Sequence, residues 1–132
     1  EAEDKNVQNG EAVLIVSYGM GVHWALNAAR EAEGKVGIID LRTLYPLDED
    51  KIFETARKYH RVLVVTEEAV NNGFAQSLAA RIQEHCFEYL DAPVVTVGSH
   101  NLPAIPLNET LEKTMVYSSE KLVQALKKLL AY

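Results

Sequence analysis

Cysteine is nearly absent from this chain, because Cys86 is the single one among 132 residues. An internal disulfide is therefore excluded, and we expect a reducing compartment such as the bacterial cytoplasm. Long apolar runs are also missing: none approaches the ~20 residues that a membrane-spanning helix needs. The sequence therefore predicts no membrane segment.

Positive charge is scarce as well. Thirteen Lys and Arg residues stand against nineteen Asp and Glu, which gives a formal net charge of −6. Because such a surface repels phosphates and anionic lipids, we expect neither nucleic acid nor a membrane as a partner. The remaining composition, 48% hydrophobic and 24% charged, is that of an ordinary globular domain with one core.

Four short apolar segments alternate with amphipathic stretches along the chain. The apolar segments cover residues 12–18, 36–40, 62–66 and 94–97. The stretches with apolar residues at helical spacing cover 21–33, 52–59, 74–87 and the residues after Ser118. Short, nearly continuous apolar runs are typical of strands buried on both faces. The pattern predicts an α/β domain with a mainly parallel sheet and helices on both of its faces.

Polar residues mark the ends of several predicted elements. Gly34 stands just past the first predicted helix, where a C-terminal glycine is usual. Asp48 precedes the second helix as a predicted N-cap. Asn9-Gly10 is a pair typical of tight hairpin turns. The polar residues 2–7 before it are predicted to be either an added edge strand or a tail.

A glycine-containing turn follows the first predicted strand. Gly19 and Gly21 precede a helix, and Asp40 closes the next strand, where dinucleotide-binding folds place a ribose-binding acid. The third glycine of that fingerprint is missing, and the bulky Trp24 stands in its place. A stand-alone dinucleotide-binding module therefore remains an alternative to a purely structural turn in which Trp24 is a packing residue.

No other pattern makes a catalytic constellation. The four histidines are scattered without metal-ligand spacing, and the adjacent His85 and Cys86 point to different faces of a helix. Ser17 lies outside a Gly-x-Ser-x-Gly elbow. Glu67 and Glu68 follow a strand at the edge where α/β sheets place ligands, but we expect capping or a subunit contact there rather than acid–base chemistry.

The segment between two buried elements at Asp40–Asp48 carries a family resemblance. It reads Asp40-Leu41-Arg42-Thr43-Leu44-Tyr45-Pro46-Leu47-Asp48. It resembles the turn shared by transketolases and the beta subunits of 2-oxo acid dehydrogenases. Further matching pieces follow in the family's order: Val13-Leu14-Ile15-Val16-Ser17-Tyr18-Gly19, Val22-His23-Trp24-Ala25-Leu26, Thr66-Glu67-Glu68-Ala69 with Gly73-Phe74, and Tyr89-Leu90-Asp91-Ala92-Pro93.

The resemblance covers essentially the whole chain and implies a fold. That fold is a three-layer α/β/α domain with a five-stranded, mostly parallel sheet whose first strand is antiparallel. Residues 2–7 are then expected to form this strand beside the third one, and a local hairpin at Asn9-Gly10 is the rival arrangement. The chain starts at Glu1 without a methionine, so we expect a single domain, residues 1–132, taken from a longer protein.

The resemblance also implies a function. It is oxidative decarboxylation of a 2-oxo acid, of the branched-chain or pyruvate type, with acyl transfer to lipoamide. Thiamine diphosphate and magnesium would be held by other domains, so we expect the isolated chain to be inactive. Its role would be assembly with an alpha subunit or fused alpha part, a second beta subunit and the subunit-binding domain of dihydrolipoyl acyltransferase. The equivalent domain of transketolase or deoxyxylulose phosphate synthase stays open as an alternative.

Two carboxylates are implied as the partner-binding site. In relatives, the aspartate of Leu-Asp-Ala-Pro and the chain-terminal carboxylate face basic residues of the acyltransferase, and here these are Asp91 and Tyr132. Two carboxylates at one rim would receive Arg or Lys and would steer association more than they supply affinity. The alternative is that Asp91 caps a turn before Pro93. No catalytic, cofactor-binding or metal-binding residue is predicted.

Overall fold

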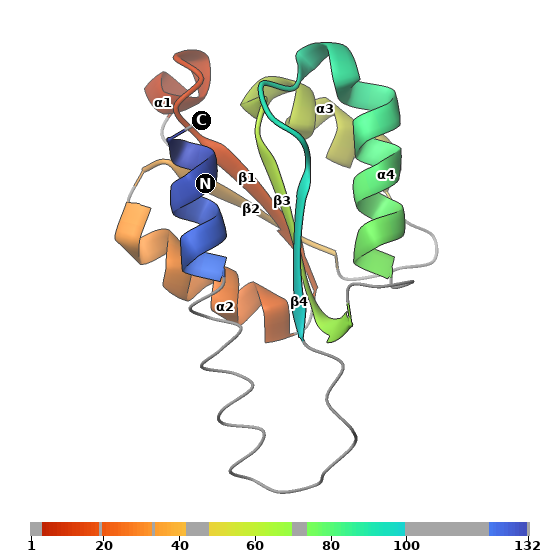
Figure 1. Ribbon diagram of the computed structural model, residues 1–132. Helices are drawn as coiled ribbons and strands as arrows, with labels where there is room; N and C mark the ends of the chain where they lie inside the picture. Colours follow the sequence, from red (N-terminus) through yellow and green to blue (C-terminus); the bar gives the residue numbers. More distant parts are fainter. Residues whose placement is uncertain are drawn as a thin grey trace, which may run out of the picture.

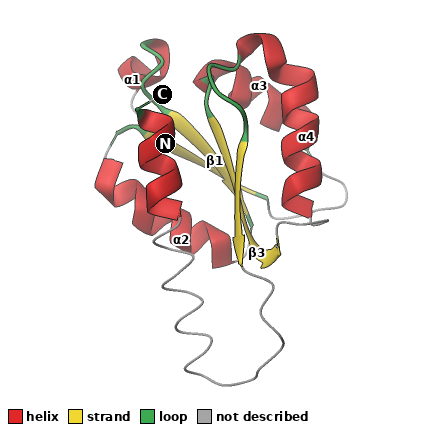
Figure 2. Cartoon of the chain, viewed as in Figure 1, coloured by secondary structure: helices red, strands yellow, loops and turns green. Residues whose placement is uncertain are grey.

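The computed structural model shows a sheet covered by helices on both faces (Figures 1 and 2). It describes residues 4–18, 20–32, 34–41, 48–69, 74–99 and 122–131. The strands are β1 (Val13–Ser17), β2 (Val36–Asp40), β3 (Val62–Ala69) and β4 (Val95–Ser99). They pair in the order β2-β1-β3-β4, and every pairing is parallel.

The alternation of side chains along β1 explains why its sequence is apolar throughout. Val13 and Ile15 point into one cluster of buried residues, whereas Leu14 and Val16 point into the other. Since successive residues of a strand face opposite sides, a strand covered on both sides needs apolar residues at every position. All five residues of β1 are buried.

Two pairs of helices form the outer layers. On one face lie α2 (Met20–Ala29) and the helix at residues 122–130, which bring Trp24 and Leu126 into the same cluster. On the other face lie α3 (Glu49–Tyr59) and α4 (Phe74–Cys86), through Ile52 and Leu78. The predicted three-layer α/β/α class is therefore confirmed (Figure 1).

The N-terminal segment differs from the prediction. Residues Asp4–Gln8 form a short helix, α1, so the antiparallel strand expected at residues 2–7 is wrong for the part that is described. This polar stretch lacks the alternating apolar side chains that a strand would bury. In its described part, Val7 packs on the core and Asn6 is buried. Within the described residues the sheet has four strands, and the fifth is not among them.

The Asn9-Gly10 pair ends α1 and does not make a hairpin. Gly10 has φ +71°, and its N–H donates to Val7 O at 3.2 Å, while the Glu11 N–H donates to Asn6 O at 2.8 Å. This pair of bonds is the Schellman motif, which needs a left-handed residue just past the helix. Glycine reaches that conformation without a steric penalty, so the hairpin arrangement is wrong for a physical reason.

The other predicted caps behave as expected. Asp48 Oδ1 accepts a hydrogen bond from the Lys51 N–H at 3.2 Å and so caps α3. Gly34 has φ +77° and follows the short 3-10 turn η1 (Arg30–Ala32) that ends the α2 region. The Arg42–Leu47 turn and the Ser118 cap lie outside the described residues.

Contacts between α3 and α4 join the ends of the two helices. The Arg81 guanidinium meets the Glu49 carboxylate with two hydrogen bonds of 2.6 Å each. Farther along, the His85 ring stacks on Phe53 at a centroid distance of 4.7 Å. Cys86 is fully buried beside it, and its thiol lies 3.6 Å from Phe53 O. Burial raises the pKa of this thiol, so Cys86 is a small core residue and not a reactive one.

No helix in the described part of the chain is long and apolar enough to cross a bilayer.

We predict that Gly37→Ala destabilises the fold. A Cβ at Gly37 would lie 2.6 Å from Cζ and 2.8 Å from Cε2 of Tyr59, and its hydroxyl would be closer still. Because the Tyr59 ring belongs to the core, relieving this overlap is expected to lower the free energy of unfolding by about 1–3 kcal/mol in chemical denaturation. In a Tyr59→Phe background the loss should be smaller, and equal losses in a double-mutant cycle would contradict this explanation.

We also predict a pH-dependent contribution from the Glu49–Arg81 pair. The hydrogen bond from Arg81 holds the pKa of the Glu49 carboxyl below its ordinary value of 4.5. The pair therefore stabilises the fold fully above pH 4.5, and this stabilisation disappears as the pH falls through the lowered pKa. Glu49→Gln should be less stable than the wild type at neutral pH, and the difference should vanish in acid.

Thermal unfolding across pH measures this effect. Glu88→Gln is the matched control, because Glu88 is exposed and makes no ion pair with another described residue. A difference in stability between Glu49→Gln and the wild type that persists unchanged in acid would contradict a role for the ionised Glu49–Arg81 pair. High salt should reduce the difference, since both side chains lie at the surface.

Candidate functional site

The carboxyl ends of the strands are where open α/β sheets bind ligands. Ser17 is fully buried there, and its hydroxyl donates to Val65 O at 2.8 Å. Tyr18 Oη and Thr66 Oγ1 share a hydrogen bond of 2.9 Å across the same strands. These hydroxyls bind within the sheet, so Ser17 is a structural residue and not a nucleophile.

Asp40, the candidate ribose-binding acid of the dinucleotide-binding alternative, lies at this same edge. Asp40 is exposed at the end of β2, in register with Ser17 of β1. The predicted turn residue Gly19 lies outside the described residues, and α2 begins immediately after it. Trp24 is 7% exposed and packs in the core with Ala25 and Ala28. The packing role predicted for Trp24 is therefore confirmed.

The metal-ligating side chains do not gather. In the described ranges, no group of three His, Cys, Asp or Glu residues is placed to hold a metal ion. His85 is exposed while Cys86 is fully buried, so the prediction that they face different directions is confirmed. His23 is also exposed, on α2.

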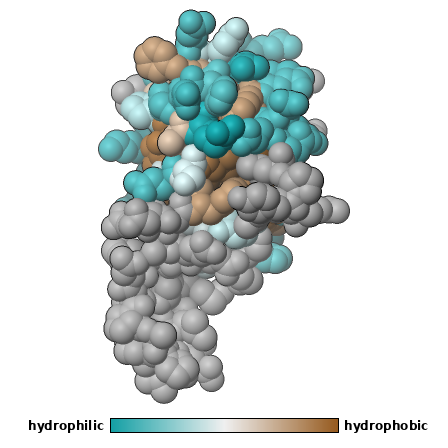
Figure 3. Space-filling view, turned by 90° about the vertical axis from the view of Figure 1, so that its right-hand side faces the viewer, coloured by the Kyte–Doolittle hydropathy of each residue, from teal (hydrophilic) through white to brown (hydrophobic). Residues whose placement is uncertain are grey.

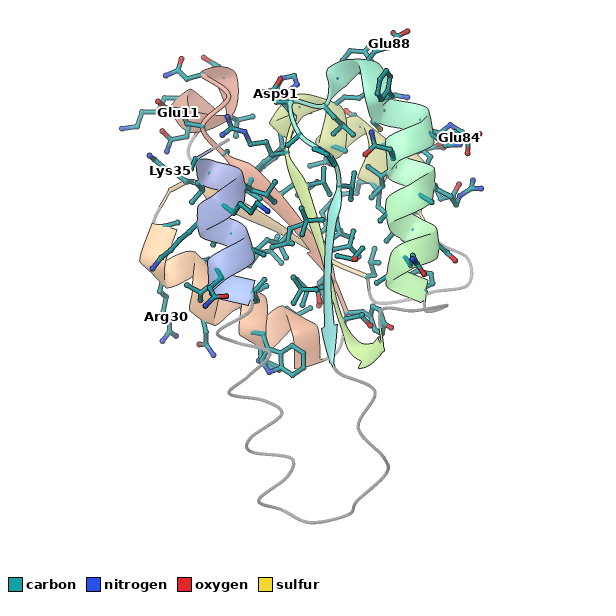
Figure 4. All side chains as sticks on the ribbon, in the orientation of Figure 1. Glu11, Arg30, Lys35, Glu84, Glu88 and Asp91 are labelled. Atoms are coloured by element: carbon teal, nitrogen blue, oxygen red, sulfur yellow. The ribbon has the colours of Figure 1, made fainter. Side chains whose placement is uncertain are left out.

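Asp91 lies at the opposite edge of the sheet, where the strands begin (Figure 4). Its side chain is exposed, and its backbone N–H donates to His60 O at 2.8 Å. The end of α1 lies beside it, because a Cβ at Gly10 would be 3.9 Å from Asp91 Oδ2. Among the residues that the structure places, none forms an ion pair or hydrogen bond with the Asp91 carboxylate. The carboxylate is thus presented to solvent by a main chain that is held in place.

Two exposed aromatic side chains precede Asp91 in the same segment of the chain. Phe87 is 69% exposed and Tyr89 is 48% exposed, although both are large and apolar. Glu88 separates them, and Figure 4 shows Glu88 and Asp91 at the same end of the molecule. In Figure 3, hydrophobic residues reach the surface near the upper left of a face whose upper part is mostly hydrophilic. Phe87, Glu88, Tyr89, Leu90 and Asp91 together are called the 87–91 segment below.

The exposure of Phe87 corrects the sequence analysis, which extended the apolar face of the helix as far as this residue. The α-helix ends at Cys86, and the chain then tightens into the 3-10 turn η2 (Phe87–Tyr89). A 3-10 turn has fewer residues per turn, so the helical spacing no longer predicts the direction of the next side chain. Helical spacing alone does not predict this change, so it does not reveal that Phe87 and Tyr89 are exposed.

A cavity adjoins the 87–91 segment. Its volume is about 310 Å³, and it is lined by Val7, Gln8, Lys58 and His60. Lys58 pairs with Glu54 of its own helix at 3.5 Å. The cavity lies between α1 and the end of α3, so it belongs to the Asp91 edge of the sheet and not to the edge that carries Asp40.

The C-terminal helix reaches the Asp91 edge as well. The helix at residues 122–130 runs antiparallel to the strands, so its end lies where the strands begin (Figure 1). Ala131 follows it and donates its N–H to Lys127 O at 3.1 Å. Tyr132, the second predicted partner-binding residue, lies outside the described residues.

Comparison with known proteins identifies relatives. The 2-oxoisovalerate dehydrogenase subunit beta of Bacillus subtilis is 39% identical over 126 residues, which are 92% of this chain and 38% of that protein. The pyruvate dehydrogenase E1 component subunit beta of Rickettsia felis is 34% identical over 131 residues, 97% of this chain and 40% of that protein. The chain thus spans about two-fifths of the length of these relatives.

A solved structure and a family profile agree with these relatives. The structure of a split-gene transketolase, an inactive beta4 tetramer, has a TM-score of 0.69 and 30% sequence identity. The match covers 92% of this chain and 40% of the transketolase chain. The family described as the transketolase C-terminal domain matches residues 3–122. The resemblance predicted from the sequence is confirmed, and the chain belongs to the transketolase C-terminal domain family.

Proposed function

We propose that this chain is an assembly domain of a 2-oxo acid dehydrogenase of the branched-chain or pyruvate type. Its membership of the transketolase C-terminal domain family supports this proposal. So do relatives named as beta subunits of 2-oxoisovalerate dehydrogenase and pyruvate dehydrogenase. The complete enzyme would decarboxylate a 2-oxo acid oxidatively and pass the acyl group to lipoamide.

The chemistry would be housed in other domains. Thiamine diphosphate and magnesium would supply the decarboxylation chemistry, but the described residues do not fit a site for them. They hold no cluster of three metal-ligating side chains, and the Ser17 hydroxyl binds within the sheet. We therefore assign no step of the reaction to this chain.

The observation that carries the assembly role is the exposed carboxylate of Asp91 in a segment that also exposes two aromatic side chains. A carboxylate held at a rim receives an Arg or Lys side chain and accelerates encounter with a basic partner. Exposed aromatic residues are enriched where protein surfaces meet. The proposed occupant of this surface is the subunit-binding domain of dihydrolipoyl acyltransferase.

Further partners complete the proposal. Tyr132, the other predicted partner-binding residue, would join Asp91, since the helix at residues 122–130 ends at the same edge of the sheet. An alpha subunit, or a fused alpha part, and a second beta subunit would pack on other surfaces. The name "subunit beta" of the relatives agrees with an enzyme made of several chains.

We predict that Asp91→Asn weakens binding of the acyltransferase subunit-binding domain and flattens its salt dependence. Removing this one charge is expected to raise Kd several-fold at low salt, which is a loss of about 1 kcal/mol in binding free energy. Most of the loss should come from slower association. Calorimetry and surface plasmon resonance at about 0.05 M and 0.5 M salt measure both effects.

Asp50→Asn is the matched control for this experiment. It makes the same change of charge on an exposed residue in the first turn of α3, at the other edge of the sheet. It should leave Kd and the salt slope unchanged. Binding that is unaffected by Asp91→Asn, or equally weakened by Asp50→Asn, would remove the docking role of Asp91.

We also predict that the purified chain does not turn over 2-oxo acids alone. Pyruvate and 3-methyl-2-oxobutanoate should remain unchanged in the presence of thiamine diphosphate and magnesium, as measured by carbon dioxide release. Measurable turnover by the chain alone would show that the reactive groups lie within it and would overturn the assembly proposal.

A further inference from the structure

His60 ends α3 in an unusual backbone conformation. Its φ of +67° is the one positive value for a non-glycine residue in the described ranges. A side chain with a Cβ is disfavoured there, which is why helices commonly place glycine at this position. The chain itself uses glycine in this way at Gly10 and Gly34. Histidine at the end of α3 therefore needs a reason other than ending the helix.

The contacts of His60 supply that reason. Its Nδ1 lies 2.6 Å from Tyr89 O, and its own carbonyl accepts the Asp91 N–H at 2.8 Å. One residue thus holds the main chain on both sides of Leu90. The backbone N–H of His60 donates to Ala56 O at 3.0 Å, which ties the same residue to α3. The 87–91 segment is in this way anchored to a rigid helix.

Other contacts also hold this segment. Leu90 packs against the core cluster, and its N–H donates to Phe87 O at 3.3 Å. Phe87 and Tyr89 are largely exposed, so burial of these two side chains contributes little to holding the segment in place. Arg57, one helical turn before His60, adds a second contact. Its Cζ lies 5.7 Å from the centroid of the Tyr89 ring, and its Nη2 donates to His85 O at 3.4 Å.

We propose that His60 is a positioning residue for partner docking, which orders the 87–91 segment before the partner arrives. The proposal rests on the docking function proposed above for Asp91. A surface that is ordered in the free protein loses less conformational entropy on binding, so the same contacts give a lower Kd. A side-chain donor at the place of Nδ1 reaches Tyr89 O, and glycine at this position would lack it.

Substitutions at position 60 separate the effect of backbone strain from the effect of positioning the 87–91 segment. His60→Gly keeps the left-handed backbone and removes the side-chain hydrogen bond. Its melting temperature should stay equal or rise, because glycine relieves the strain, while Kd for the acyltransferase subunit-binding domain should rise about tenfold through lost preordering. The salt dependence of binding should stay near that of the wild type, because the Asp91 carboxylate is kept.

His60→Asn is the rescue variant. Asparagine tolerates the left-handed conformation, and its side-chain N–H donor occupies nearly the position of Nδ1 in histidine. Its Kd should return to within about threefold of the wild type, the difference expected for an imperfect hydrogen bond. A merely structural role would instead make Kd follow melting temperature across the series.

Amide hydrogen exchange at Asp91 is the second readout, and it needs no partner. Exchange should be faster in His60→Gly than in the wild type and slow again in His60→Asn. Wild-type affinity and unchanged exchange in His60→Gly would overturn the positioning role, and so would failure of His60→Asn to restore both. If the wild-type chain does not bind the subunit-binding domain at all, the proposed docking function itself fails, and the exchange data alone decide whether His60 orders the segment.

Discussion

The arrangement of the whole domain depends on the burial of β1 and β3 on both faces. Leu14 and Val64 anchor one layer of helices, while Ile15 and Val65 anchor the other. Because both faces are covered, any polar group in these strands must find a partner inside the sheet, as the Ser17 hydroxyl does at Val65 O. The buried residues of β1 and β3 therefore leave no room for a solvated reactive group between the strands and the helices that cover them.

The edge at which the strands begin carries the residues of the proposed docking surface. The end of α3 holds the 87–91 segment through main-chain atoms, which leaves the Asp91 carboxylate and the Tyr89 ring at the surface. Because backbone hydrogen bonds hold the segment, its side chains remain available for contact with a partner. Arg57 contributes to the same end by contacting both His85 O and the Tyr89 ring. The last turn of α3 thus acts as the support of the proposed docking surface.

Much of the fold was predictable because its signals are local. Continuous apolar runs indicated strands with two covered faces, and Asp48 and Gly34 were recognised as helix ends from their residue type. The predictions that failed, at Asn9-Gly10 and at Phe87, also depend on local signals. Asn9-Gly10 is compatible with both a hairpin and a helix C-terminus, and tertiary contacts such as Asn6 Nδ2 to Gly34 O at 2.7 Å decide between them. The helical spacing predicted as far as Phe87 fails there, because the sequence does not mark the change from α-helix to 3-10 turn after Cys86.

The sequence by itself determined the layered α/β architecture, the acidic character of the chain and its family, since each depends on composition, periodicity or motif order. Asp91 was also predicted from the sequence as a partner-binding residue, through the Leu-Asp-Ala-Pro resemblance. Only the tertiary structure decided that Asp91, Phe87 and Tyr89 are all exposed, and that His60 holds their segment. His60 and Tyr89 are 29 positions apart, and no local pattern relates them. Their contact arises because α3 and α4 pack on the same face of the sheet and end at the same edge.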